Sequence, residues 1–394
     1  MRFRCKQMLV CCADFKSLLW IAKYFALTGA CWALHATHSS SLCVVFMRIV
    51  VLSYYSFAAA CITHNTMHTR CFSSTTAERV YRLLLTMAYG HPVSTFVPGH
   101  NLSHHRHLQS KRDPMRTGLV SYKCHILNLL LFQPTVAPGV ARMDMRYTHL
   151  QRDQNMVYYT HVCTEWAVLV ASQCACLLCD WRRFGLYLLL PHLFAQWAIV
   201  SMNLIQHDGC EQQTKSTTTN AVTPVNYNTC RNFTGALVNF LTFNNGFHTI
   251  HHLYPTMHWS RLPHEHDKIK HNIHPQLNQA SMPAYLYTTF VSPGTRLHYL
   301  GGPMLSSGDE GGNDQHDDGS CADWIQDHKA SKTQLSTRTH PLSPSRPAGK
   351  HAVSRRLAAV FGAGAGTWDP LLTSIKTPKP PSRPNPTCTH ALEK

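Results

Sequence analysis

Four long apolar segments stand out from the pattern of hydrophobic and polar positions, at residues 17–35, 42–62, 163–179 and 185–206. Lys23 and Arg48 are isolated charges in the first two, and no segment has the polar face of a helix on the surface of a soluble domain. A helix of about 20 apolar residues crosses the roughly 30 Å hydrocarbon core of a bilayer. The pattern therefore predicts four transmembrane helices rather than the buried helices of a large soluble protein.

Shorter apolar stretches occur at residues 83–90, 126–132 and 235–243. They are too short to span a bilayer. We expect them to form interfacial helices or parts of a cap outside the membrane.

The four long segments form two hairpins, with short connections at residues 36–41 and 180–184. The stretch 63–162 between the hairpins contains 11 Lys and Arg, and further basic residues lie in residues 1–16. By the positive-inside rule, both regions are cytosolic. The predicted fold is an all-α integral membrane protein with four transmembrane helices in two hairpins and a cytosolic helical cap.

The composition changes near residue 300. Residues 301–394 are rich in Gly, Ser, Asp, Pro and Thr, which cannot bury enough apolar surface to order the chain. We therefore expect four parts along the chain: a cytosolic N-terminus (1–16), a membrane-bound domain (17–280), a connecting segment (281–300) and a disordered tail (301–394).

Histidine is the unusual feature of the composition. Of the 394 residues 28 are His, whereas charged residues make up only 14%, roughly half the usual share. The first 300 residues contain 23 His but only 11 Asp and Glu. The basic residues behind the net charge of +16 are scattered singly between apolar runs, which argues against nucleic-acid binding. Most of the 16 Cys lie inside apolar segments and are expected to be free thiols. Histidine should therefore carry the chemistry of this protein.

Three groups of histidines have the spacing of metal ligands, in the sequences HNTMH, HNLSHH and HTIHH. Histidines three or four residues apart share one face of a helix, so each group can direct two or three imidazoles the same way. Imidazole binds Fe, Zn, Cu and Ni, which leaves the identity of the metal open. The eight residues are His64, His68, His100, His104, His105, His248, His251 and His252.

The hairpin topology brings these groups to one side of the membrane. The second segment ends beside His64, and the fourth ends with Asn203 and His207 on the same, cytosolic side. With three or five spans, some groups would lie on opposite faces. The sequence therefore predicts a histidine-rich metal site in the cytosolic cap. Five other histidines lack a partner at such spacing and are not expected to be ligands, namely His107, His264, His266, His271 and His274.

At these residues the chain resembles the membrane-bound fatty acid desaturase superfamily, the histidine-box enzymes with a non-haem di-iron centre. The resemblance covers about residues 40–275 and is most specific at HNLSHH, NLIQH and NNGFHTIHHLYPTMHWSRLP. It implies two iron ions held by nine histidines, with Asn203 reaching iron through a water molecule. The implied ligands are His64, His68, His100, His104, His105, His207, His248, His251 and His252.

The resemblance also implies an activity, the O2-dependent introduction of a double bond into a fatty acyl chain. The sequence contains neither a fused cytochrome b5 signature nor the four-cysteine spacing of a rubredoxin or ferredoxin, so a separate donor, cytochrome b5 or ferredoxin, would supply electrons. One departure from the family pattern is Asn65, where an acidic residue often follows the first histidine; it bears on fine tuning rather than on ligation. The endoplasmic reticulum is the favoured membrane, with a plastid or bacterial membrane as the alternative.

Two other interpretations stay open at this point. A hydroxylase or ketolase of the same superfamily, acting on a carotenoid, sterol, sphingolipid or alkane, would begin with the same hydrogen abstraction. In a non-catalytic membrane metal-binding protein or transporter, ionisable ligands are expected deep within the spans. Here the histidines lie at the span ends instead. Lys111, Arg112 and Arg116 could bind an acyl head group or an acidic electron donor, or could simply mark the cytosolic face.

Overall fold

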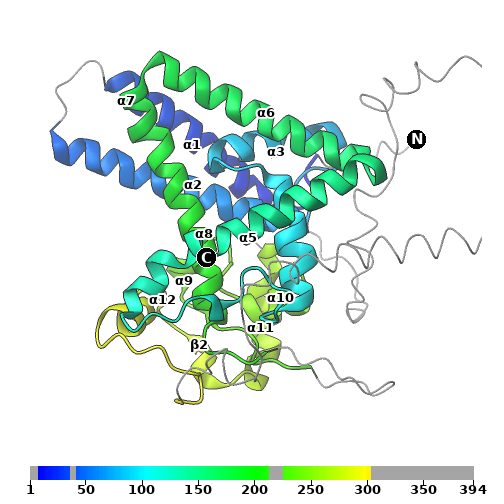
Figure 1. Cartoon of the computed structure of the whole chain (residues 1–394), viewed down its shortest axis with the longest axis vertical. Helices are drawn as coiled ribbons and strands as arrows, with labels where there is room; N and C mark the ends of the chain where they lie inside the picture. The colour runs from blue at the N-terminus through cyan, green and yellow to red at the C-terminus, as the bar shows by residue number, and fades with distance from the viewer. Residues whose placement is uncertain (1–7, 36–40, 213–224, 303–394) are drawn as a thin grey trace, which may run out of the picture. The chain divides into compact units, whose positions relative to one another are not determined.

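The computed structural model describes residues 8–35, 41–212 and 225–302, and these residues are mostly helical. Its long helices, seen in Figure 1, are α1 (Asp14–Leu34), α2 (Leu42–His68), α3 (Thr75–Tyr89), α5 (His125–Gln154), α6 (Met156–Cys179) and α8 (Leu190–His207). Shorter helices are α4 (His105–His107), α7 (Trp181–Phe184), α9 (Ala236–Leu241), α10 (His248–Leu253), α11 (Leu262–Ile269) and α12 (Met282–Leu286). β1 (Asn232–Phe233) and β2 (Asn278–Gln279) form a two-stranded parallel sheet.

Four of the described helical segments are long and apolar enough to cross a membrane, as predicted: α1, α2, α6 and the continuous stretch Trp181–His207. Only 17–50% of the apolar stretch in each is buried by the rest of the protein. Large apolar side chains such as Phe46 and Leu178 are exposed on these helices. A soluble protein rarely exposes so much apolar surface to water. The protein is therefore a membrane protein.

The observed spans are longer than the apolar segments indicate. α6 begins at Met156 rather than at residue 163, because the Asn155 side chain caps its first turn by accepting from the Tyr158 N–H at 3.1 Å. α2 continues beyond residue 62 to His68. Asp180 ends α6 and caps α7, so the second hairpin turns within one residue.

The stretch from Trp181 to His207 is not a uniform α-helix. A π-helical segment, η4 (Gly185–Leu189), separates α7 from α8, and Pro191 stands in the first turn of α8. α2 packs along α8, and α3 also contacts α8. Gly90 ends α3 with φ +76°, and a Cβ on it would lie 2.3 Å from the His192 ring of α8, so only glycine fits.

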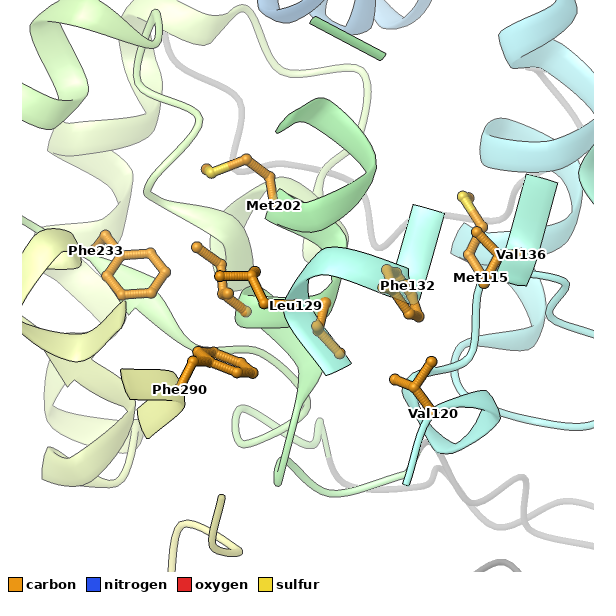
Figure 2. Packing of buried hydrophobic residues seen from close by; sticks show 10 residues of the cluster. Met115, Val120, Leu129, Phe132, Val136, Met202, Phe233 and Phe290 are labelled. Carbon is orange, nitrogen blue, oxygen red and sulfur yellow. The ribbon is translucent and has the colours of Figure 1, made fainter. Parts of the chain in front are cut away.

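α5 is longer than its apolar stretch at 126–132 indicates. It runs for 30 residues and contains Pro134 and Pro138, and it packs against both α6 and α8. One buried cluster joins α5, α8, β1 and the segment η8 (Tyr287–Val291), as Figure 2 shows. Phe132 is fully buried in this cluster, with Met202 of α8, Phe233 of β1 and Phe290 of η8 as other members.

Residues 281–302 follow the predicted boundary of the membrane domain at 280. Phe290 belongs to the buried cluster, and Arg296 pairs with Asp208 directly after α8. This part therefore packs closely on the helices that lead to the histidines. The remainder of the predicted tail, from residue 303, lies outside the described residues.

Candidate metal centre

The nine predicted histidines come from four separate parts of the chain. α2 carries His64 and His68 in its last two turns, and α8 ends at His207. The second motif lies in a π-helical segment, η2 (Val97–His104), followed at once by α4. The third motif forms the short helix α10. Segments far apart in the sequence are thus brought to one place.

The histidines gather into two groups, within each of which the nearest ring nitrogens all lie within 4.8 Å of one another. The first group has five members, His64, His68, His100, His105 and His251. The second has four, His104, His207, His248 and His252. The sequence motifs do not correspond to these groups, because the adjacent residues His104 and His105 belong to different ones.

The π-helical form of η2 explains part of this division. A π-helix joins residue i to residue i+5, so it brings His100 and His105 into register, and both belong to the first group. α10 is an ordinary short helix, in which His248 and His252, four residues apart, share the second group. His251 of the same helix, three residues after His248, belongs instead to the first group.

The distances between ring nitrogens fit metal ligation. In the first group, the Nε2 atoms of His68 and His100, of His100 and His105, and of His105 and His251 each lie 3.1 Å apart. In the second group, Nε2 of His207 lies 3.2 Å from that of His104 and 2.9 Å from that of His248. Two nitrogens bound at right angles about 2.1 Å from one ion would lie about 3 Å apart. Each group therefore has the donor set and spacing to hold one metal ion.

The electrostatic state of these histidines also suits ligation. Burial, and after it the neighbouring imidazoles, lower the pKa of five of them far below the usual value, so they carry lone pairs at neutral pH. These five lie outside the spans and are His100, His105, His248, His251 and His252.

A buried carboxylate stands behind one histidine of the second group. His104 Nδ1 lies 2.9 Å from Asp113 Oδ2. Asp113 also accepts from the backbone N–H of Gln109 at 3.0 Å and of Met115 at 2.9 Å. Burial alone would raise the pKa of Asp113, but His104 and these donors outweigh it and hold the pKa below its usual value. The carboxylate therefore orients His104 so that Nε2 faces the group.

The outer nitrogens of the other histidines are held unequally. His207 Nδ1 lies 3.1 Å from the Thr229 carbonyl oxygen, which keeps a proton on Nδ1 and leaves Nε2 free to bind metal. Among the described residues, no hydrogen-bond partner faces the buried Nδ1 of His248 in the second group, or of His64, His68 and His105 in the first. Outer partners therefore support two histidines of the four-membered group, His104 and His207.

Asn203 lies one turn before His207 in α8. Its Nδ2 donates to the backbone carbonyl of Met115, two residues after Asp113, at 2.8 Å. Its side chain also lines a cavity of about 620 Å³. This cavity lies between α5, α6 and α8 and reaches both histidine groups, since His64, His100 and His248 line it. Its volume is that of a site for an organic ligand.

Asp113 and Thr229 are parts of the site that sequence reasoning missed. The three basic residues around Asp113 drew attention to that stretch, but the carboxylate itself did not. Asp113 is one of only 11 acidic residues in the first 300, and this scarcity is the one signal that could have singled it out, because a separation of nine residues from His104 matches no helical repeat. Thr229 contributes a backbone carbonyl, which leaves no signal in side-chain chemistry. The five histidines not expected to be ligands belong to neither group among the described residues.

Together, the membrane-spanning helices and the two histidine groups define a membrane protein with two clusters of histidines, each of which could hold a metal ion. The family model for fatty acid desaturases matches residues 39–281, and the chain belongs to this family. A comparison with curated proteins found no match. Family membership makes the protein a lipid-modifying enzyme of the desaturase and hydroxylase type, which uses a lipid substrate and an electron donor.

Proposed function

We propose that this protein is a lipid desaturase that introduces a double bond into a fatty acyl chain, using O2 and a di-iron centre. The observation that carries this proposal is the cavity, because one continuous space lies beside both histidine groups and extends between α5, α6 and α8. Apolar side chains such as Val136, Val140 and Ile199 line much of it. A hydrocarbon chain in this space would have one carbon facing the histidines.

The nine histidines would hold two ions, five around one and four around the other. The chemistry that bound iron supplies is the activation of O2 to remove hydrogen from an unactivated C–H bond, which no acidic or basic side chain can do. The protein's part is to hold the ligands, orient the chain and exclude water. Asp113 and the Thr229 carbonyl keep His104 and His207 oriented. Asn203 is the proposed water-mediated contact.

The nitrogen ligands fit iron, and they fit other divalent metal ions as well. An all-nitrogen shell of imidazoles suits a reduced divalent ion, and no Asp or Glu belongs to either histidine group in the described part of the chain. Electrons would come from a separate cytochrome b5 or ferredoxin, and the endoplasmic reticulum is the proposed membrane. A hydroxylase or ketolase would use the same site, because desaturation and hydroxylation share their first step.

Expression in a host that lacks its own desaturase tests the proposal. Gas chromatography–mass spectrometry of the lipids should show a new double bond, dependent on O2, and the purified protein should contain two irons per chain. A new hydroxyl or keto group would favour the alternative enzyme. Labile zinc together with unchanged lipids would overturn the enzymatic interpretation. His104→Ala is the matched inactive control, since it removes one ligand and leaves the cavity-lining residues in place.

A further inference from the structure

One face of α5 forms a long wall of the cavity. The lining residues on this face follow the helical repeat from Gln133 through Val136, Val140 and Asp144 to Thr148. From Gln133 to Thr148 the helix rises about 22 Å, at 1.5 Å per residue. Most of the wall is apolar, as expected for a hydrocarbon chain, but Asp144 places a carboxyl group in it.

The amide groups that α8 contributes to the cavity lining are bonded to the protein itself. Gln196 Nε2 donates to the Gly90 carbonyl at 2.9 Å, and Gln206 Nε2 donates to the Asn245 carbonyl at 2.7 Å. Asn203 is held in the same way by Met115. These amides are therefore part of the scaffold, and their donors are not available to a ligand.

Asp144 differs from these amides. Its Oδ1 is hidden from solvent and has no hydrogen-bond partner among the described residues. Burial raises the pKa of this carboxyl well above its usual value. A buried polar group without a partner destabilises a fold, so such groups are rare unless a ligand satisfies them. Because Asp144 also lines the cavity, its carboxyl is a group that a bound ligand could contact.

The Asp144 carboxyl lies close to a segment that carries part of the first histidine group. Its Oδ1 lies 3.7 Å from the point that a Cβ on Gly99 would occupy. Gly99 also lines the cavity, and the next residue is His100 of the first group. The carboxyl therefore lies against the segment that leads into the first histidine group.

We propose that Asp144 binds a hydroxyl group carried on the hydrocarbon chain of the substrate, so that the enzyme acts on a hydroxylated lipid in preference to an unsubstituted one. This inference rests on the proposed function and narrows its substrate class. A hydroxyl both donates and accepts, so it pairs with a carboxyl in either protonation state. It is uncharged, so it enters an apolar cavity at lower desolvation cost than an ammonium group.

Binding measurements on the purified, full-length protein in detergent test this proposal without requiring turnover. The probes are octadecanoate and a series of monohydroxyoctadecanoates with the hydroxyl at successive carbons, each competing against a fluorescent fatty acid. We expect at least one positional isomer to bind about tenfold or more tightly than octadecanoate, since a site that pairs a hydroxyl rejects the chain that lacks it.

Two variants test whether Asp144 causes the preference for the hydroxylated chain. Asp144→Leu should bring the hydroxylated and plain chains to within about twofold, while Asp144→Asn, which still pairs with a hydroxyl, should retain most of the preference. Asp153→Leu, at an exposed position near the end of the same helix, is the matched control and should bind like the unmodified protein. Thermal unfolding checks that each variant is folded.

Equal binding of all probes, or a preference that survives in Asp144→Leu, overturns the inference. This result leaves the proposed desaturase activity standing, since that activity is tested by iron content and lipid products. Conversely, a hydroxyl preference in a protein that oxidises no lipid supports the Asp144 site and counts against the proposed function alone.

Discussion

His104 and Asp113 form a fully buried pair, with Nδ1 and Oδ2 2.9 Å apart and neither side chain exposed to solvent. The pair connects a histidine of the four-membered group to a loop held by the backbone N–H groups of Gln109 and Met115. Its geometry determines which nitrogen of His104 faces the group. An acidic residue that binds no metal can thus set the quality of a metal site.

Replacing Asp113 tests this relationship directly. Asp113→Asn and Asp113→Ala should weaken metal binding about 10- to 100-fold, because loss of an outer partner of a ligand has that size of effect. Metal titration of the purified variants measures it. The exposed Asp267→Ala is the control and should bind metal normally. Unchanged affinity in Asp113→Ala would mean that His104 is held by the packing around it.

Substitutions of His207 and His107 compare a proposed ligand with a buried histidine that belongs to neither group. His207→Ala should remove one metal ion and abolish lipid oxidation, because it deletes one of four ligands. His107 belongs to neither group among the described residues, so His107→Ala should retain two metals and most of the activity. Metal analysis and product analysis of both variants decide this. Equal losses in the two variants would show that the proposed ligand set is wrong.

The buried ion pair of Asp208 and Arg296 ties residues 281–302 to the end of α8. Arg296 Nη2 lies 2.6 Å from Asp208 Oδ1, and Arg296 Nε lies 2.8 Å from Oδ2. Arg296→Leu should lower the free energy of unfolding by about 3–5 kcal/mol, since it leaves a buried carboxylate without a partner. Denaturant unfolding in detergent measures the change.

Two further variants separate this pair from a surface ion pair. Asp208→Asn combined with Arg296→Leu should recover part of the lost stability, because no unpaired charge stays buried. Arg261, which is 63% exposed and pairs with Glu265 at 3.7 Å, provides the comparison. Arg261→Leu should change the free energy of unfolding by less than about 1 kcal/mol. A similar cost for Arg261→Leu and Arg296→Leu would contradict the buried-pair interpretation.

Filling the cavity should separate substrate binding from metal binding. Val140 lines the cavity from α5 and belongs to neither histidine group. Val140→Trp should reduce turnover of long-chain lipids about tenfold or more, because the indole occupies space that the chain needs, while two metals stay bound. Metal analysis and lipid turnover are measured on the same preparation. Full turnover in this variant would show that the chain binds elsewhere.

Local sequence features predicted the main outlines of this protein. The four apolar segments predicted the spans because crossing a bilayer depends on length and hydrophobicity, which one segment carries by itself. The histidine spacings predicted that the histidines cluster, since residues three or four apart are neighbours on an α-helix, but not how they divide into two groups. Helix ends were less predictable, as α6 and α2 show, because a capping side chain or continued packing extends a helix beyond its apolar run.

The tertiary structure alone decided how these parts combine. The neighbours His104 and His105 go to different groups, because η2 is π-helical and because His104 meets His207 of α8 whereas His105 meets His251 of α10. The partnership of Asp113 with His104, the carbonyl of Thr229 behind His207, and the position of the Asp144 carboxyl beside Gly99 all depend on how loops and helices pack. The sequence by itself determined a four-span membrane protein with clustered histidines. Which histidines group together, and what shape the cavity has, follow from contacts between residues far apart in the chain, and local spacing carries no information about those contacts.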